Sequence, residues 1–485
     1  MKILGINETT HDAAVCVIED GQVLFAAHAE RYSKTKNDWF TNAEILDEAL
    51  SYGVPDRIAY YELASLKKIR IMLTGGFGGG TPFYKKYKPL KGIKAHSFSH
   101  HYSHASAGYY TSKSTDAAIV VLDAIGEFTT SSIWVGEGER ITKVEQTRYP
   151  VSFGLFYSAF TQLVGLKPNE EEYIMMGMAA YGDPKRYFDL VNSYFSKMNE
   201  QKYNLHTGIW DWPNEVEEQD RFDIAAAAQE VYEVRLLNYM TRARKLTGKD
   251  NLVFMGGCAL NSKANTLLWS VFRDVWIMPN PGDAGSALGA AAALYGKHLD
   301  WQGPYLGTEI GGEYPVSEIV DAIIKDGIVA VANGRAEYGP RALGNRSILA
   351  DPRDPNIKDK VNAIKKRELF RPFAPVVMEE HASEWFDMDY ASPYMQFTPR
   401  CLKPDLIPSV VHFDGTSRVQ TVNSQQHPGL YAALRRFYAA TGVPVLLNTS
   451  LNIKGQPLLN DISDVAAWEL EYNSKILMNS RSALF

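Results

Sequence analysis

The sequence contains little cysteine, no long apolar run and no excess of basic residues. Its 485 residues include three cysteines, which lie far apart and form no C-x-x-C pair: Cys16, Cys258 and Cys401. This pattern argues against a disulfide framework and against a zinc knuckle. No apolar stretch is long enough to span a membrane, and polar residues follow Met1 too closely for a signal peptide. We therefore expect a cytoplasmic protein with no membrane association.

The net charge of -6 argues against a protein that binds nucleic acid or membranes over its whole surface, but does not exclude a local basic patch. A chain of this length exceeds one ordinary core, so we expect two or three domains. Residues 301–314 are rich in glycine, proline and aromatic residues, which is typical of a boundary. The predicted domains are 1–308 and 309–485, and the final residues are a candidate for packing back onto the first domain.

Two parts of the N-terminal half show the same order of predicted elements. In each part a strand is followed by a hairpin, and the turn Asp20-Gly21 is a strong signal for the first of these hairpins. The predicted strands are 2–6, 13–18 and 22–28 in the first part and 117–122, 131–136 and 141–146 in the second. This repetition predicts an α/β fold of the duplicated RNase H-like (actin and sugar-kinase) type, with two halves facing each other across a cleft.

Three histidines in five residues, His100, His101 and His104, open a run of small residues with helical character. Two imidazoles at i and i+4 lie on one face of a helix, and Asp123 ends the apolar strand that follows. Two nitrogen ligands and one oxygen ligand suit a catalytic divalent metal better than a closed structural zinc site. Asp283, in a glycine-rich turn, is a plausible fourth ligand or a helix N-cap. The alternative to a metal site is a surface helix, and His96 competes as a partner of His100.

Two other segments carry weaker signals. The pair Gly256-Gly257 follows a predicted strand, so its backbone N–H groups could approach a nucleotide closely. Residues 74–96 combine a glycine-rich loop with lysines and aromatic residues. This basic loop is either a solvated surface segment or a binding loop for an anionic acceptor. Its candidate acceptor residues are Tyr84, Lys85, Lys86, Tyr87 and Lys88.

Six arginines fall between residues 335 and 371, interspersed with glycine and proline. They do not form the charged stripe of a solvated helix. Arginine binds phosphate and carboxylate through two parallel hydrogen bonds. The C-terminal half therefore has the composition of a phosphate-rich substrate site.

Eight motifs spread over nearly the whole chain resemble those of the NodU/CmcH family of O-carbamoyltransferases. In chain order they are THDAAVCVIEDGQVLFAAHAER, HHYSHA, VVLDAIGE, GGCALN, PGDAGSALGAA, EYGPRALGNRSILADPR, FRPFAP and LLNTSLNIKGQP. The resemblance implies an N-terminal domain like the tRNA-threonylcarbamoylation protein, with an iron-type metal, and a C-terminal α+β domain of YrdC-like type. It also implies that carbamoyl phosphate and ATP, with Mg²⁺, form carbamoyl adenylate, whose carbamoyl group passes to an acceptor hydroxyl.

The motif positions imply individual roles. His11 would be the general base or would orient the acceptor hydroxyl, and the metal, most plausibly Fe²⁺, would be held by His100, His104, Asp123 and Asp283. The nucleotide would be contacted by Gly256, Gly257 and Asn261. The carbamoyl phosphate and adenylate site would be lined by Arg341, Arg346, Arg371, His412, Arg418, Asn448 and Ser450.

The sequence departs from the family where we expect the acceptor pocket. Ile174, Met178 and Ala180 replace the usual lysine, leucine and proline, and the segment after them is short. These changes argue against a bulky sugar or antibiotic, so we slightly favour the hydroxymethyl group of a modified pyrimidine in DNA. A small-molecule hydroxyl is the alternative, and a tRNA threonylcarbamoyl transferase or a non-catalytic regulator is remote. A homodimer remains open.

Overall fold

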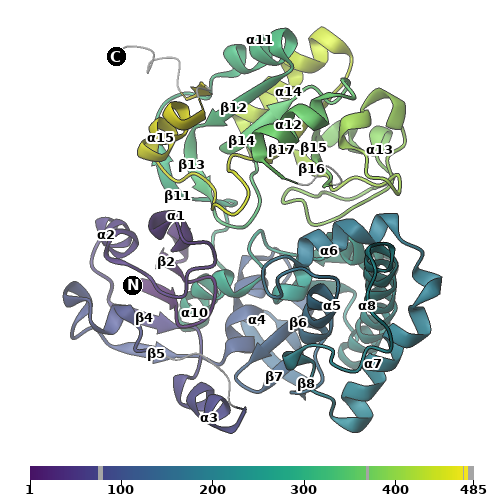
Figure 1. The fold of residues 1–485 in the computed structure, drawn as a ribbon. Helices are drawn as coiled ribbons and strands as arrows, with labels where there is room; N and C mark the ends of the chain where they lie inside the picture. Colours follow the sequence, from purple (N-terminus) through teal and green to yellow (C-terminus); the bar gives the residue numbers. More distant parts are fainter. Residues whose placement is uncertain (75–79, 368–370, 473–474, 479–485) are drawn as a thin grey trace. The chain divides into compact units, whose positions relative to one another are not determined.

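The computed structural model describes residues 1–74, 80–367, 371–472 and 475–478 (Figure 1). They form two compact units. The first contains residues 1–29 and 37–301, and the second contains residues 30–36 and 302–485. The expected boundary between residues 308 and 309 falls inside strand β11 (Tyr305–Ile310) of the second unit.

The first unit begins with a sheet of five described strands in the order β3-β2-β1-β4-β5. The strands are β1 (Lys2–Asn7), β2 (Ala14–Glu19), β3 (Gln22–His28), β4 (Arg57–Tyr60) and β5 (Ala95–Ser97). The first three are antiparallel neighbours, and β4 and β5 continue the sheet in parallel to β1. Asp20 and Gly21 both have positive φ, so the predicted hairpin turn is confirmed.

The second sheet repeats this plan in the order β8-β7-β6-β9-β10. Its strands are β6 (Asp116–Gly126), β7 (Thr129–Glu137), β8 (Arg140–Arg148), β9 (Asn251–Met255) and β10 (Asp274–Trp276). Here too the first three strands are antiparallel and the last two are parallel additions. Because strand order and direction agree strand by strand, the predicted duplicated RNase H-like fold is confirmed.

Helices α4 (His100–Thr111) and α10 (Ser286–Tyr295) lie between the two sheets, where Figure 1 shows them at the centre of this unit. Their small residues allow close contact between the helix backbones. A Cβ atom on Gly289 of α10 would lie 1.9 Å from the carbonyl oxygen of Ser103 on α4, and one on Gly5 of β1 would lie 2.0 Å from the carbonyl oxygen of Ala287. The run GSALGAAAAL is therefore a packing surface that fixes the position of α4.

The other helices of the first unit flank these sheets. They are α2 (Ala43–Ser51), α3 (Ala64–Thr74), α5 (Phe153–Leu163), α6 (Glu172–Met178), α7 (Phe188–Gln201), α8 (Glu218–Thr247) and α9 (Ser262–Thr266). Helix α8 begins with a capping box between Glu217 and Asp220. None of the helices in the described ranges is long and apolar enough to cross a membrane.

The second unit is an α+β unit, as expected. Its mixed sheet has the order β16-β15-β17-β14-β12-β18, and β11 pairs with β13 beside it. The remaining elements are α1 (Glu30–Ser33), α11 (Val316–Asp326), β12 (Ile328–Ala332), β13 (Gly334–Glu337), β14 (Arg346–Ala350), α12 (Ile357–Lys365), β15 (Ala374–Met378), α13 (Ala382–Trp385), β16 (Gln420–Val422), α14 (Pro428–Thr441), β17 (Val445–Ser450), α15 (Ile462–Tyr472) and β18 (Ile476–Leu477).

Helix α1 belongs to the second unit although it lies near the start of the chain. Arg31 is buried and donates to the carbonyl oxygen of Gly339 at 2.8 Å. The hydroxyls of Tyr32 and Thr308 lie 2.9 Å apart. The sequence patterns did not reveal this excursion of the chain.

Candidate active site

Two histidines and two aspartates converge in the first unit. His100 and His104 lie one turn apart on α4, and their Nε2 atoms are 3.1 Å apart. The Nε2 atom of His100 lies 2.9 Å from Oδ2 of Asp123, and that of His104 lies 3.3 Å from Oδ1 of Asp283. One ligand atom from each of the four residues lies within 4.8 Å of the others, and all four side chains are buried.

The local backbone explains how these side chains meet. Helix α4 begins at His100 because Ser99 has an extended N-cap conformation, and the Glu127 carboxylate accepts the His100 N–H at 3.1 Å. Strand β6 continues through Asp123, but its pairing with β7 shifts register after Leu122. Such an irregularity turns the Asp123 side chain away from the direction that a regular strand would give it. The fourth residue, Asp283, begins the short turn η8 (Asp283–Gly285).

His96 is excluded as the helical partner of His100, because it lies in β5 and precedes the start of α4. His101 also points elsewhere, since its Nδ1 atom lies 2.7 Å from Oγ of Ser132. The i, i+4 pair is therefore His100 and His104.

The charges of the four residues are strongly coupled. Burial disfavours a charged imidazole, but Asp283 and Asp123 outweigh this effect and raise the pKa of His100 well above its usual value. They raise the pKa of His104 in the same way. Burial also penalises the carboxylates, yet the two histidines hold the pKa values of Asp123 and Asp283 below the usual range.

This donor set fits a divalent transition metal. Two imidazole nitrogens and two carboxylate oxygens face a common point, and imidazole with carboxylate suits Fe²⁺, Mn²⁺ or Zn²⁺. The four carry two negative charges when both imidazoles are neutral, which a divalent cation would balance. Buried charges of one sign are costly without such a partner.

His11 lies beside this group. Its Nε2 atom is 3.9 Å from Oδ2 of Asp283, and its Nδ1 atom is 2.8 Å from Oδ2 of Asp12. The amide of Asn7 donates to the carbonyl oxygens of Asp12 and Asp283 and so ties the two loops together. The imidazole is 42% exposed, which leaves room for a reacting group. Loss of hydration opposes the charged imidazole, but the hydrogen bond to Asp12 and the charges of Asp12 and Asp283 raise the pKa of His11 to about 10.

The predicted nucleotide residues have mixed environments. Gly256 has a φ of 92°, and a Cβ atom there would lie 2.1 Å from the carbonyl oxygen of Leu122, so only glycine fits. A Cβ atom on the next residue, Gly257, would lie 3.2 Å from Oδ1 of Asp123. Asn261 has a structural role, because its Oδ1 atom accepts the N–H of Ala264 and its amide pairs with that of Gln229. The two glycines therefore remain the better candidates.

The lysine-rich segment is held against the first sheet. The Glu8 carboxylate accepts the N–H groups of Phe83 at 2.6 Å and Tyr84 at 3.3 Å. Tyr84 is buried against Tyr60, with ring centroids 5.6 Å apart, so its ring faces are not available for stacking on a base. All five lysines of this segment are exposed: Lys85, Lys86, Lys88, Lys91 and Lys94. The Tyr87 hydroxyl donates to Asp47, and residues 75–79, which include four of the glycines, lie outside the described residues.

In the second unit, positive charges gather around Arg418. Burial and the charges of Arg341, Arg367 and Arg371 lower the pKa of Arg418 well below its usual value. Its buried Nε atom has no hydrogen-bond partner among the described residues. An anion bound among these arginines would relieve their repulsion, and the guanidinium group suits phosphate and carboxylate. This cluster is therefore a candidate phosphate site, as the arginine-rich composition predicted.

The other predicted site residues of this unit differ in how many of their polar atoms are hydrogen-bonded. The Nδ2 atom of Asn448 donates to Gln420 and to the carbonyl of Ala342, whereas its buried Oδ1 atom has no partner within the described ranges. Ser450 is bonded to Lys365, a buried residue that the sequence patterns did not single out. Nδ1 of His412 lies 3.2 Å from the hydroxyl of Thr416.

Arg346 has a structural environment rather than the substrate-binding one that the sequence predicted. It is fully buried, and each of its guanidinium nitrogens donates to backbone carbonyl oxygens. The acceptors are Asn460, Asn333, Gly334, Asn345 and Thr308. Since no side of the fork is left for a phosphate, this geometry argues against a role for Arg346 in binding carbamoyl phosphate.

The same sequence motif contains a second structural anchor. Oε1 of Glu337 accepts the backbone N–H groups of Leu343, Asn345 and Arg346 at 2.8–3.2 Å. Together Glu337 and Arg346 fix the loop that carries Arg341. The motif EYGPRALGNRS therefore builds the phosphate site partly through residues that do not line it.

The chain thus combines a duplicated RNase H-like unit that has a candidate metal centre with an α+β unit that has a cationic cluster. The family model described as Carbamoyltransferase N-terminus matches residues 41–292, and the one described as Carbamoyltransferase C-terminus matches residues 320–483. The chain belongs to the carbamoyltransferase family. The predicted enzyme class and the resemblance to NodU/CmcH proteins are confirmed.

Named relatives agree with this assignment. The nodulation protein NolNO of Sinorhizobium fredii is 32% identical over 94% of this chain and 76% of its own length. The 3'-hydroxymethylcephem-O-carbamoyltransferase of Amycolatopsis lactamdurans is 30% identical over 94% of both chains. The uncharacterized protein sll1178 of Synechocystis is 31% identical over 94% of this chain and 92% of its own length.

Similar solved structures are more distant. Component A of the Acidaminococcus fermentans (R)-2-hydroxyglutaryl-CoA dehydratase has a TM-score of 0.36 and 13% identity over 60% of this chain and 97% of its own. Full-length HypF in a phosphate- and nucleotide-bound form has a TM-score of 0.33 and 13% identity over 60% and 46%. These scores are too low to support an argument about fold or function.

Proposed function

We propose that the protein is an ATP-dependent O-carbamoyltransferase in which each unit carries one half of the reaction. Carbamoyl phosphate and ATP would form carbamoyl adenylate in the second, YrdC-like unit. The carbamoyl group would then be transferred to an acceptor hydroxyl in the first unit. The observation that carries this proposal is the convergence of His11 with the buried group His100, His104, Asp123 and Asp283.

The arginine cluster supports the first half-reaction. Carbamoyl phosphate and one water give carbamate and phosphate, and a carbamate oxygen then attacks the α-phosphorus of ATP and displaces pyrophosphate. Arg341, Arg371 and Arg418 would bind the phosphates, because they are close enough to repel one another. The unpartnered Oδ1 atom of Asn448 would accept a hydrogen bond from the carbamoyl NH₂ group.

His11 supports the second half-reaction. The acceptor oxygen forms a bond to the carbonyl carbon, the bond from that carbon to the adenylate oxygen breaks, and AMP leaves with the electron pair. The hydroxyl proton passes to Nε2 of His11, because Nδ1 is bonded to Asp12. A base must be neutral, and a cation that balanced the charges of Asp123 and Asp283 would favour the neutral imidazole by removing part of what raises the pKa of His11. The metal, Fe²⁺ in our proposal, would supply Lewis acidity next to the adenylate phosphate.

We propose a small-molecule alcohol as the acceptor, in place of the hydroxymethylated DNA base that the sequence slightly favoured. One relative bears the name of a hydroxymethylcephem carbamoyltransferase. The burial of Tyr84 also removes one of the two rings, Tyr84 and Tyr87, that the DNA hypothesis offered for base stacking. Lys85, Lys86 and Lys88 are exposed and remain available to a phosphate backbone, so DNA is the competing acceptor.

The division of labour can be tested with purified full-length protein, ATP and carbamoyl phosphate. We expect His11→Ala to retain pyrophosphate release and to lose carbamoylation of benzyl alcohol or a hydroxymethylcytosine oligonucleotide. Arg418→Gln should lose pyrophosphate release. His96→Ala, in β5, is the matched control and should retain both activities. Loss of both activities in a folded His11→Ala protein would contradict the proposed partition.

A second comparison decides the acceptor. Replacement of Lys85, Lys86 and Lys88 by glutamine should leave transfer to a small alcohol unchanged. If the oligonucleotide is the better acceptor of the wild type and the lysine variant loses that activity, the acceptor is DNA.

A further inference from the structure

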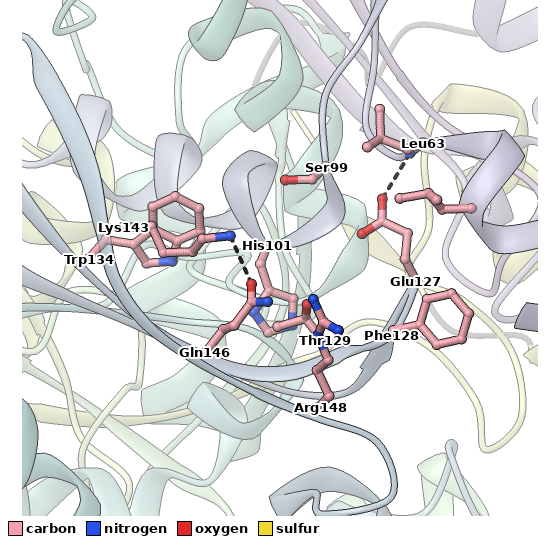
Figure 2. Close-up of a pocket in the computed structure, with 11 residues that line it drawn as sticks. Leu63, Ser99, His101, Glu127, Phe128, Thr129, Trp134, Lys143, Gln146 and Arg148 are labelled. Atoms are coloured by element: carbon pink, nitrogen blue, oxygen red, sulfur yellow. Dashed lines mark hydrogen bonds between the residues drawn. The ribbon is translucent and has the colours of Figure 1, made fainter.

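A cavity of about 440 Å³ opens in the first unit beside the N-terminal end of α4 (Figure 2). It lies between strands β7 and β8 and the segment that follows β4. Its lining residues are Leu63, Leu66, Ser99, His101, Glu127, Phe128, Thr129, Trp134, Lys143, Gln146 and Arg148. Its volume is that of a site for a small organic molecule.

A chain of hydrogen bonds orients His101 in the wall of this cavity. Indole N–H is only a donor, and Nε1 of Trp134 donates to Oγ of Ser132 at 2.8 Å. The Ser132 hydroxyl can then give its own hydrogen to Nδ1 of His101, 2.7 Å away. A histidine that accepts at Nδ1 carries its ring hydrogen at Nε2. That Nε2 atom is buried and has no hydrogen-bond partner in the part of the chain that the structure describes.

The available charge of the cavity is positive. Arg148 is exposed, and its side chain forms no ion pair or hydrogen bond with any described residue. Lys143 lies over the Trp134 ring, 5.3 Å from its centroid, and is bonded only to the neutral Gln146. Glu127 is the one carboxylate among the lining residues, and its Oε1 atom accepts the N–H groups of Leu63 and His100.

The cavity and the candidate metal centre share a wall. Glu127 lines the cavity and binds the backbone of His100, one of the four converging residues. A Cβ atom on the neighbouring Gly126 would lie 2.3 Å from Cδ2 of His100, so the turn lies directly on that imidazole. Figure 2 shows Glu127 on one side of the cavity and Lys143 and Gln146 on the other, with His101 between them.

We propose that this cavity binds the acceptor and that the acceptor is an alcohol bearing an anionic group, a carboxylate or a phosphate. The anion would be bound by Lys143 and Arg148, and the His101 ring would form part of the cavity wall. The hydroxyl would lie at the Glu127 end, which is the end of the cavity nearest to His100 and to the group beside which His11 lies. This inference rests on the proposed function, because it names the substrate class of the same transfer reaction.

Direct binding to the full-length protein tests the inference without catalysis. The probes are 4-(hydroxymethyl)benzoate and 4-(hydroxymethyl)phenyl phosphate, with benzyl alcohol as the uncharged partner, measured by isothermal titration calorimetry. We expect at least one anionic probe to bind about tenfold more tightly than benzyl alcohol, since charge-assisted hydrogen bonds are the stronger ones. The tighter of the two identifies the anionic group.

The variant Lys143→Gln/Arg148→Gln should abolish this preference and leave the affinity for benzyl alcohol unchanged. Arg140→Gln is the matched control, because Arg140 is an exposed residue of the same strand that does not line the cavity. Equal affinity for all three probes, no saturable binding of either anionic probe, or an unchanged preference in the double variant would overturn the inference.

Transfer assays separate this inference from the proposed function. Suppose that the wild type carbamoylates alcohols and that the double variant has the wild-type KM for both the anionic and the neutral acceptors. The inference then fails, and the proposed function stands. If no alcohol is carbamoylated although the anionic probes bind through Lys143 and Arg148, the proposed function fails and the cavity remains an anion-selective ligand site.

Discussion

The Nε2 atoms of His100 and His104 lie 3.1 Å apart at the centre of a buried group that contains two aspartates. The same nitrogen of each ring therefore points to one place. At this distance one neutral ring can donate its Nε2–H to the lone pair of the other, whereas two protonated rings bring two positive charges into contact. The aspartates raise the pKa values of both rings and so favour the protonated state when no cation is bound. A cation that binds this group has to displace protons.

We predict that His104→Ala loses the metal. The purified wild type should contain about one equivalent of a transition metal by plasma mass spectrometry, and the variant less than about a tenth of that, because removing one of four ligands leaves a weak site. His96→Ala should keep the wild-type content. A full equivalent in folded His104→Ala would show that these residues are not the metal site.

Metal uptake should release protons. The carboxylates raise the pKa of His100, and the two imidazoles lower those of Asp123 and Asp283, so the metal-free group carries protons on its imidazoles at neutral pH. The apparent metal affinity should therefore rise with pH between about 6 and 8. Titration of the metal-free protein with Fe²⁺ or Mn²⁺ at these pH values measures this change, and a pH-independent affinity would contradict it.

Arg346→Lys should destabilise the protein rather than alter substrate binding. Lysine cannot replace the donors that Arg346 gives to five buried carbonyl groups, so the free energy of unfolding should fall by at least about 3 kcal/mol. Arg353→Lys is the control, because Arg353 forms a partly exposed pair with Asp351 and should change stability by less than about 1 kcal/mol. Wild-type stability of Arg346→Lys with a large loss of carbamoyl phosphate affinity would reverse our assignment.

Arg341→Gln, unlike Arg346→Lys, should not destabilise the protein. The charge of Arg341 lowers the pKa of Arg418, so its removal relieves repulsion in the cluster. We expect the thermal midpoint to stay equal or to rise while pyrophosphate release is lost. Differential scanning fluorimetry and a pyrophosphate assay on the same preparation test both parts. A clear loss of stability would show that no such repulsion exists.

His427 predicts how stability depends on pH. It begins α14, where its Nδ1 atom accepts the N–H of Leu430 and its Nε2 atom donates to Asn345. Burial lowers the pKa of His427 to about 4, so the unfolded chain binds more protons than the folded one between pH 4 and 6.5. This contribution is complete above pH 6.5 and is lost as the pH falls towards 4, by about 3 kcal/mol in total.

The thermal midpoint of His427→Asn, which keeps an N-cap oxygen, should therefore fall less between pH 7 and 4.5 than that of the wild type. His381→Asn serves as a surface control. Parallel pH profiles of wild type and His427→Asn would contradict this account.

Much of the first unit could be predicted from the sequence because its signals are local. The Asp20-Gly21 turn and the alternation around it define a hairpin, and a second copy of the pattern reveals the duplication. The pair His100 and His104 needs only the helical period to share one face. Such short-range regularities depend on few neighbours, and tertiary packing leaves them intact.

The remainder depends on contacts between distant segments, which no local pattern contains. Arg346 looked like a substrate ligand because arginine in a glycine-rich stretch suits phosphate, but its acceptors at Thr308, Asn333 and Asn460 are defined only by the folded unit. Likewise, the cavity joins Leu63, His101 and Arg148, which share no motif. The lysines around Tyr84 suggested an exposed binding loop, yet the Tyr84 ring packs against Tyr60.

Helix α1 has a consequence for how this chain is made. The second unit takes residues 30–36 from near the start of the chain and all its other residues from position 302 onwards. During synthesis the segment with Arg31 leaves the ribosome early, and Gly339, whose carbonyl it binds, follows only after the whole of the first unit. Three covalent crossings link the units, at residues 29/30, 36/37 and 301/302. A cut at 29/30 or at 36/37 leaves the second unit covalently attached to the first, whereas a cut at 301/302 separates residues 302–485 from residues 30–36. A gene fragment that starts at position 302 therefore encodes the second unit without its earliest helix.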